Sequence, residues 1–235
     1  MALVFRSSIG WGLLFSNLVL TALHSLLFQR RLSVFERLHR QQAFGRRNLA
    51  ILKRVCGLDC EVIGQENLPA PPYVIVANHQ STFETITFQA IFPPFAWVLK
   101  ESLTRGLVIG NALSRLGPIA IRRDAPVRAL KQVLREGELR LKAGICVLVF
   151  PEGTRFEPGD LGQIAGSAAA LARRARVPIV PVVHNAGEFW APYSATIRPG
   201  RVKVKIGKTI SAKSLLASSV REVGELLSKE LNAME

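Results

Sequence analysis

Acidic residues are scarce in this sequence of 235 residues: 17 Asp and Glu face 31 Lys and Arg, and the formal net charge is +14. Such an imbalance argues against a basic ligand and indicates an anionic partner, either nucleic acid or a phospholipid surface. The chain is long enough for one domain with a full hydrophobic core, plus an appendage.

Cysteines are also few. Cys56, Cys60 and Cys146 are an odd number, and no second Cys or His pair completes a zinc site around the first two. We therefore expect three reduced thiols in a cytosolic setting, and no metal. A Gly-x-Ser-x-Gly elbow is missing as well, so the serine nucleophile of the α/β-hydrolases is not indicated.

Charge is absent from residues 9–28, which hold no Asp, Glu, Lys or Arg. Twenty helical residues span about 30 Å, enough for the core of a bilayer. A secretory signal competes with this interpretation, but no small-residue cleavage site follows and Arg30 and Arg31 come directly after the run. Four polar residues share one face of this helix, which favours packing against a partner, or partial insertion, over spanning alone: Asn17, Thr21, His24 and Ser25.

Basic residues are concentrated just after this helix. From Arg30 to Arg54 there are eight basic residues and one acid, Glu36, a net charge of +7. The positive-inside bias places the rest of the chain in the cytoplasm, at the inner membrane. We expect residues 1–56 to form a membrane helix and a basic amphipathic helix on an anionic phospholipid surface, with a solvated basic helix as the alternative.

Residues 57–235 alternate short apolar runs with amphipathic stretches, a pattern typical of an α/β domain with a mixed, largely parallel sheet flanked by helices. Strands are expected near 60–63, 73–77, 96–99, 119–121, 145–150, 179–183 and 202–206. Helices are expected near 81–91, 105–113, 126–142, 166–176 and 211–231.

The stretch from Tyr73 to Thr85 predicts a buried strand, a tight turn at His79 and a helix that begins near Ser81. On one regular helix His79 and Glu84 would point about 140° apart, so they meet only if His79 lies in the turn. An imidazole held by a carboxylate is a general base. Alternatively, Glu84 completes a capping box with Ser81, and His79 is structural.

Three further polar clusters follow strands or lie in turns: 117–123, which ends in Arg122 and Arg123; 150–155, Phe-Pro-Glu-Gly-Thr-Arg; and 177–182, a strand framed by prolines. Each alone has an ordinary explanation as a strand end or a turn. Arginine suits phosphate because its planar group donates hydrogen bonds in pairs and stays charged.

Together, in this order, the His79–Glu84 pair and the three clusters resemble the four blocks of the glycerolipid acyltransferase family, and most closely its bacterial 1-acylglycerol-3-phosphate acyltransferases. The resemblance covers roughly Leu58 to Lys208. It implies transfer of a fatty acyl group from an acyl carrier protein or coenzyme A thioester to lysophosphatidic acid, which gives phosphatidic acid. It implies no cofactor beyond the thioester and no nucleic acid.

The resemblance also implies roles for particular residues. His79 would be the general base on the sn-2 hydroxyl and Glu84 would orient it. The glycerol phosphate would be bound by a cationic and glycine-containing set: Lys100, Arg123, Glu152, Gly153, Thr154 and Arg155. His24 is assigned to the polar face of the first helix, His39 to the surface and His184 to a strand end.

Three positions depart from the family pattern. Glu84 replaces the usual Asp, Arg122 stands where an Asp usually precedes the arginine, and Ile164 and Ala165 precede Gly166 where a Lys is often found. A different lyso-lipid, such as lyso-ornithine lipid, is therefore an alternative acceptor. A non-enzymatic nucleic-acid-binding protein is the remaining alternative, disfavoured because the basic residues adjoin an apolar helix and few aromatic residues lie among them.

Overall fold

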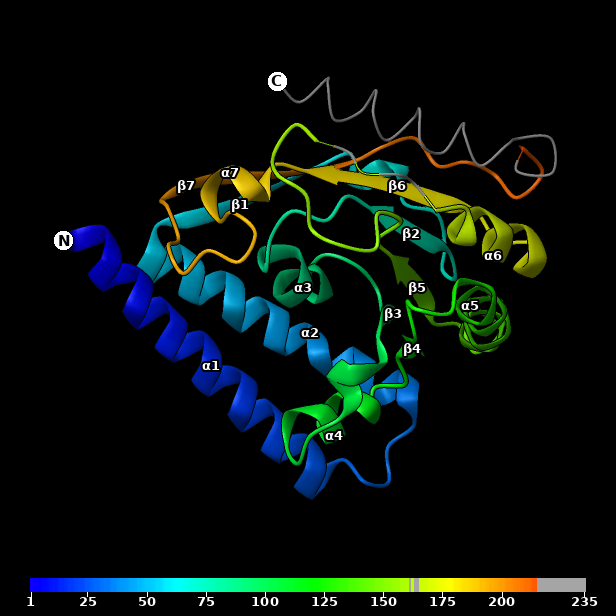
Figure 1. Ribbon diagram of the computed structural model, residues 1–235, viewed down its shortest axis with the longest axis horizontal. Coiled ribbons are helices and arrows are strands. Elements are labelled where there is room, and N and C mark those ends of the chain that lie inside the picture. The colour runs from blue at the N-terminus through cyan, green and yellow to red at the C-terminus, as the bar shows by residue number, and fades with distance from the viewer. Residues whose placement is uncertain (161, 163–164, 215–235) are drawn as a thin grey trace.

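A seven-stranded β-sheet runs through the molecule with helices on both faces (Figure 1). The coordinates are a computed structural model, which describes residues 1–160, 162 and 165–214. The strands are β1 (Leu58–Ile63), β2 (Val74–Ala77), β3 (Phe95–Lys100), β4 (Ile119–Ile121), β5 (Cys146–Val149), β6 (Ile179–His184) and β7 (Gly200–Ile206). All seven strands expected from the sequence are present.

The strand order is β1-β7-β6-β2-β5-β3-β4. Strands β6, β2, β5, β3 and β4 are mutually parallel, β7 runs antiparallel to β6, and β1 runs parallel to β7. The prediction of a mixed, largely parallel sheet is confirmed. Five strands therefore end at the same edge of the sheet.

The helices are α1 (Ala2–Phe28), α2 (Val34–Ile51), α3 (Phe83–Thr87), α4 (Ile109–Ser114), α5 (Pro126–Lys142), α6 (Ser167–Ala175) and α7 (Ala186–Phe189). Shorter helical turns are η1 (Leu52–Cys56), η2 (Gln65–Asn67), η3 (Phe88–Ala90) and η4 (Glu101–Thr104). The helix expected near 81–91 is thus divided into α3 and η3. The helix expected over 211–231 lies almost wholly outside the described residues.

Two hydrophobic cores lie on the two faces of the sheet. Along β2, Ile75 and Ala77 belong to the core under α1, α2 and α3, whereas Val74 and Val76 face the core under α5 and α6. Because both faces are covered, the central strands are continuous apolar runs instead of alternating ones. Figure 1 shows α1 and α2 side by side on one face, with α5 and α6 at the other.

Helix α1 packs its polar stripe against α2. Asn17 Nδ2 donates to Asn48 Oδ1 (2.7 Å), and Arg47 donates to Asn17 Oδ1 (2.7 Å) and Thr21 Oγ1 (3.0 Å). The prediction that this polar face packs against a partner is therefore met by α2, the next helix of the same chain. A capping box begins α2, since Ser33 and Glu36 each accept the other's backbone amide.

Most of α1 is not covered by the protein. Among the described residues, it is the one helix with the length and composition of a membrane span, and 22% of its apolar window is buried. Leu14 on its inner side joins the core that also holds Leu38 of α2 and Leu52 of η1. The first 56 residues and the α/β layers thus share one core.

Candidate active site

The polar clusters meet at one edge of the sheet because the five parallel strands all end there. The ends of β2, β3, β4 and β6 contribute His79, Lys100, Arg123 and His184 respectively, and the turn after β5 contributes residues 150–155. Segments separated by up to about a hundred residues in the sequence thus supply one site.

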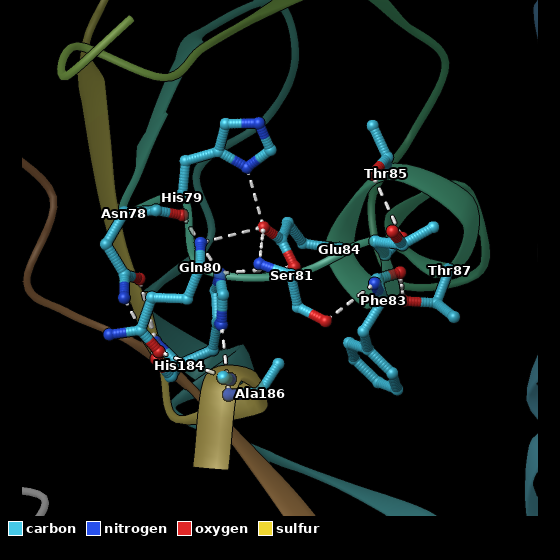
Figure 2. A network of polar contacts seen from close by, with 12 residues as sticks. Asn78, His79, Gln80, Ser81, Phe83, Glu84, Thr85, Thr87, His184 and Ala186 are labelled. Atoms are coloured by element: carbon cyan, nitrogen blue, oxygen red, sulfur yellow. Dashed lines mark hydrogen bonds and ion pairs between the residues drawn. The ribbon is translucent and has the colours of Figure 1, made fainter. Parts of the chain in front are cut away.

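His79 and Glu84 form a hydrogen-bonded pair in which Nδ1 of the ring lies 2.7 Å from Glu84 Oε1 (Figure 2). The same carboxylate oxygen accepts the backbone amides of Gln80 (3.0 Å) and Ser81 (2.8 Å). Glu84 thus accepts the amide of Ser81 and also orients the imidazole, but the capping box is incomplete, because the Ser81 hydroxyl accepts the amide of Phe83 and not that of Glu84. His79 lies in the turn and Glu84 in the first turn of α3, the arrangement that lets them meet.

Contacts on both sides hold the ring of His79. The ring stacks on Phe150, with centroids 4.2 Å apart and planes at 14°. Glu84 is fully buried, whereas the His79 side chain keeps 13% of its surface exposed. When Nδ1 donates its proton to Glu84, the other ring nitrogen, Nε2, carries the lone pair of the neutral imidazole. Figure 2 shows that this second nitrogen lies on the side of the ring away from the Glu84 carboxylate. The pair can therefore accept a proton from a bound hydroxyl.

His184 is a second histidine of this network, and sequence reasoning placed it only at a strand end. It is fully buried, its Nε2 lies 2.9 Å from the Asn78 carbonyl oxygen, and the same nitrogen lies 3.9 Å from Glu84 Oε2. Asn78 and His184 also exchange hydrogen bonds through the Asn78 side chain (2.9 and 3.0 Å). These bonds fasten the turn before His79 to the end of β6.

The protonation states of this network follow from burial and contacts. Burial lowers the pKa of His184, and its Nδ1 accepts the amide of Ala186 (3.3 Å), so the ring is neutral with its proton on Nε2. Burial alone would raise the pKa of Glu84, but His184, His79 and the Ser81 amide outweigh it and the pKa lies below its usual value. Glu84 is therefore an anion beneath His79 at neutral pH.

Glu152 contacts the backbone of His79. Its Oε2 accepts the backbone amide of His79 (2.7 Å), while the His79 carbonyl accepts the amide of Phe156 (2.9 Å). Burial, assisted by the negative charge of Glu84 and opposed by the His79 amide, raises the pKa of Glu152 to about 7. Gly153 follows with φ of 71°, a left-handed conformation that favours glycine.

A cavity of about 310 Å³ opens beside His79. Four residues expected to bind substrate line it together with the imidazole: Lys100, Arg123, Gly153 and Arg155. The side chains of Glu152 and Thr154, expected to bind substrate as well, do not line it; Thr154 is exposed. The guanidinium of Arg155 lies 5.5 Å from the centre of the Tyr193 ring, a cation–π contact.

Two departures from the family pattern have a structural outcome. Arg122 pairs with Asp124 (2.8 Å) at the surface and does not line the cavity, so it adds no charge to the site. Ile164 lies outside the described residues. Glu84 in place of Asp reaches His79 and both amides, as described above.

The cysteines take no part in this site. All three are free; Cys56 and Cys146 are buried and Cys60 is partly buried. Burial raises the pKa of the Cys60 and Cys146 thiols to about 12, so neither is a thiolate at neutral pH. His24 bonds Gln29 (3.1 Å) at the end of α1 and does not line the cavity beside His79, and His39 is exposed.

Comparison with known proteins agrees with this geometry. Residues 59–185, just over half of the chain, match the model of the acyltransferase family. This chain belongs to the acyltransferase family. The resemblance carried by its four sequence blocks is thereby confirmed.

Individual acyltransferases are similar over much of their length. The chain is 40% identical to the 1-acyl-sn-glycerol-3-phosphate acyltransferase of Pseudomonas aeruginosa, over 73% of this chain and 66% of that one. It is 33% identical to the Saccharomyces cerevisiae protein of the same name, over 74% of this chain and 59% of that one. It thus spans about three fifths to two thirds of these relatives.

The fold is similar to that in the crystal structure of PlsC, the 1-acyl-sn-glycerophosphate acyltransferase of Thermotoga maritima. The TM-score is 0.80 at 24% sequence identity, over 100% of this chain and 98% of that one. This likeness extends to the N-terminal helices as well as the sheet.

Proposed function

We propose that this acyltransferase moves a fatty acyl group from an acyl thioester to the sn-2 hydroxyl of 1-acylglycerol-3-phosphate and so makes phosphatidic acid. The observation that carries the proposal is one cavity that holds the imidazole of His79, three cationic side chains and a long apolar wall. A lyso-lipid phosphate presents the matching groups: an anion, a hydroxyl and an acyl chain. The names of the similar enzymes from Pseudomonas aeruginosa and Saccharomyces cerevisiae support the same reaction.

His79 acts on the hydroxyl directly. Nε2 accepts the hydroxyl proton while the hydroxyl oxygen attacks the thioester carbonyl carbon. The carbon–sulfur bond of the tetrahedral intermediate then breaks, and the thiolate takes the proton from His79. The anionic Glu84, 2.7 Å from Nδ1, stabilises the imidazolium that forms between the two steps. A thioester is already activated, so a covalent acyl-enzyme is unnecessary.

Lys100, Arg123 and Arg155 hold the phosphate. They come from the ends of β3 and β4 and from the turn after β5, so they can surround one anion from different sides. Arginine forks donate two parallel hydrogen bonds to phosphate oxygens, and the lysine adds a compact charge. An acceptor without a phosphate leaves these three cations uncompensated.

The membrane supplies the lyso-lipid. Apolar side chains of α1 face outward, and the basic residues of α2 and η1 lie next to it with exposed Arg40, Arg46 and Arg54. An anionic leaflet attracts such residues. We place α1 in the inner membrane and the α/β layers on its cytoplasmic face, where acyl carrier protein or coenzyme A thioesters serve as donors.

An acceptor panel tests this function. Purified protein in detergent is given one acyl thioester and either 1-acylglycerol-3-phosphate, 1-acylglycerol or lyso-ornithine lipid. We expect rapid transfer to the phosphate acceptor alone, and a raised KM for that acceptor in Arg123→Ala. Equal or faster transfer to lyso-ornithine lipid, or no transfer to any acceptor, contradicts the proposal.

A further inference from the structure

The cavity beside His79 is apolar over most of its wall. Leu18 of α1, Phe44 of α2, Trp97 of β3 and Leu113 of α4 all line it. These elements surround it on the face of the sheet that α1 and α2 cover. A fatty acyl chain suits such a wall, because burying its methylenes is favourable and needs no directional partner.

Five uncharged polar residues besides His79 line this wall, and two of them, Thr21 and Thr85, have hydrogen-bond partners in the protein. The other three come from different elements: Ser25 of α1, Gln41 of α2 and Gln89 of η3. They are 1%, 7% and 6% exposed. Ser25 Oγ and Gln89 Oε1 are buried without a hydrogen-bond partner, although the Gln89 amide nitrogen donates to the Thr85 carbonyl oxygen. The Gln41 side chain has no hydrogen-bond partner among the described residues.

Such groups are unusual in a cavity built only for hydrocarbon. Buried polar groups nearly always have partners, and those left over in a native structure point to a ligand or to ordered water. Ligand pockets commonly combine an apolar wall with a few placed polar groups that select the ligand. The three residues converge on one space although they lie on three helical segments.

We infer that this cavity takes an acyl chain that itself carries a hydrogen-bonding group, such as a hydroxyl, which Ser25, Gln41 and Gln89 bind. The inference rests on the proposed acyl transfer and adds the class of chain. Both substrates bring an acyl chain, so the hydroxylated chain belongs either to the thioester or to the lyso-lipid. The shared chemistry is a hydroxyl within hydrocarbon.

The experiment compares chains of equal length with and without a hydroxyl. Purified protein in detergent receives plain acyl thioesters, or thioesters with one hydroxyl near the carbonyl, in mid-chain or near the methyl end, with a plain lyso-lipid as acceptor. A second arm places the hydroxyl on the lyso-lipid instead. We expect kcat/KM for at least one hydroxylated chain to exceed that of its plain counterpart by about ten-fold, the effect of one additional buried hydrogen bond.

Matched variants connect the preference to the polar groups. Ser25→Ala and Gln41→Met should reduce the ratio of hydroxylated to plain kcat/KM to about one. Ser16→Ala on the exposed side of the same helix, and Gln42→Met next to Gln41, should keep the wild-type ratio, because neither residue lines the cavity. The ratio is independent of the amount of folded enzyme.

Two results overturn the inference while leaving acyl transfer intact. One is a wild-type protein that uses plain chains as well as, or better than, every hydroxylated chain, which would mean that the polar groups hold water only. The other is a preference that survives in both Ser25→Ala and Gln41→Met. Absence of transfer from every donor to every acceptor would instead be a failure of the proposed function.

Discussion

Glu84 connects the local conformation of the chain to its chemistry. One carboxylate oxygen accepts hydrogen bonds from Nδ1–H of His79 and from the backbone amides of Gln80 and Ser81. The carboxylate that binds the amides just before α3 therefore also holds the imidazole. A fully buried carboxylate is costly unless its charge is compensated in this way. His184 lies on the other side of Glu84, but its Nε2 is 3.9 Å from Oε2, too far for a hydrogen bond, and that second carboxylate oxygen is buried without a hydrogen-bond partner among the described residues.

Replacing His79 tests the base. His79→Ala should lower turnover by about 10²–10⁴-fold, since that is the usual contribution of general base catalysis. The fold should stay intact but the thermal unfolding midpoint should fall, because the ring stacks on Phe150 and donates to the fully buried Glu84 carboxylate, so turnover is expressed per folded enzyme. His39→Ala removes an exposed histidine and should leave turnover unchanged. A His79→Ala enzyme with near-normal turnover would remove His79 from the mechanism.

Glu152 provides a prediction about pH. Its pKa is raised to about 7 in the folded protein, chiefly by burial, so folding favours the protonated form. This contribution to stability is complete below the ordinary glutamate pKa and is lost as the pH rises through about 7. Glu152→Gln keeps an oxygen to accept the His79 amide but cannot ionise. The unfolding midpoint of the wild type should therefore fall relative to that of the variant between pH 6 and pH 8, about one unit either side of the shifted pKa. Parallel curves would mean that Glu152 titrates normally.

At the scale of the elements, the position of α2 depends on a close approach. A Cβ at Gly45 would lie 2.7 Å from the backbone nitrogen of Ala90 in η3. The chain at η3 follows α3 directly, so the distance between α2 and η3 also sets the wall of the cavity at Gln89. The two segments can meet this closely only because residue 45 has no side chain.

Gly45→Ala should consequently destabilise the protein by about 1–3 kcal/mol, the usual cost of overpacking. Gly12→Ala is the matched control, because a Cβ there meets nothing within 4 Å and alanine favours a helix by up to about 1 kcal/mol over glycine. Chemical unfolding in detergent, followed by circular dichroism, measures both. Equal stability of the two variants would show that α2 and η3 can move apart without cost.

At the scale of the whole molecule, apolar and basic surfaces adjoin. Phe15 and Leu20 of α1 are 59% and 67% exposed. The basic residues of α2 and η1 follow directly in the chain. A surface of this kind binds a bilayer through apolar burial supplemented by attraction to anionic lipids, and salt weakens only the second part.

Membrane binding should therefore persist at high salt in the wild type and be lost in the double variant Phe15→Asp, Leu20→Asp. An aspartate costs about 2.5–3.5 kcal/mol at the centre of a membrane helix. The control is Leu130→Asp, Leu139→Asp on α5, where the leucines are 41% and 56% exposed and far from α1. Vesicle flotation with and without concentrated salt gives the bound fractions. Release of the wild type by salt alone would mean that α1 does not insert.

The sequence by itself determined the elements and the identity of the central pair. The seven strands, the break at His79 and the carboxylate at Glu84 depend on apolar periodicity and on caps within a few residues of one another, which adjacent side chains specify. Arg123 and Arg155 belong to polar clusters that follow predicted strands, but their role, and the choice of Lys100, came from the resemblance to the acyltransferase family and not from the pattern alone.

Only the tertiary structure decided which elements became neighbours. His184 joins Glu84 because β6 lies beside β2, Glu152 turns beneath His79 because β5 lies on the other side of β2, and α1 finds its polar partner in α2. Ser25, Gln41 and Gln89 meet in one cavity for the same reason. Strand order and helix packing result from burying the whole apolar surface at once, and no short stretch of sequence contains that information.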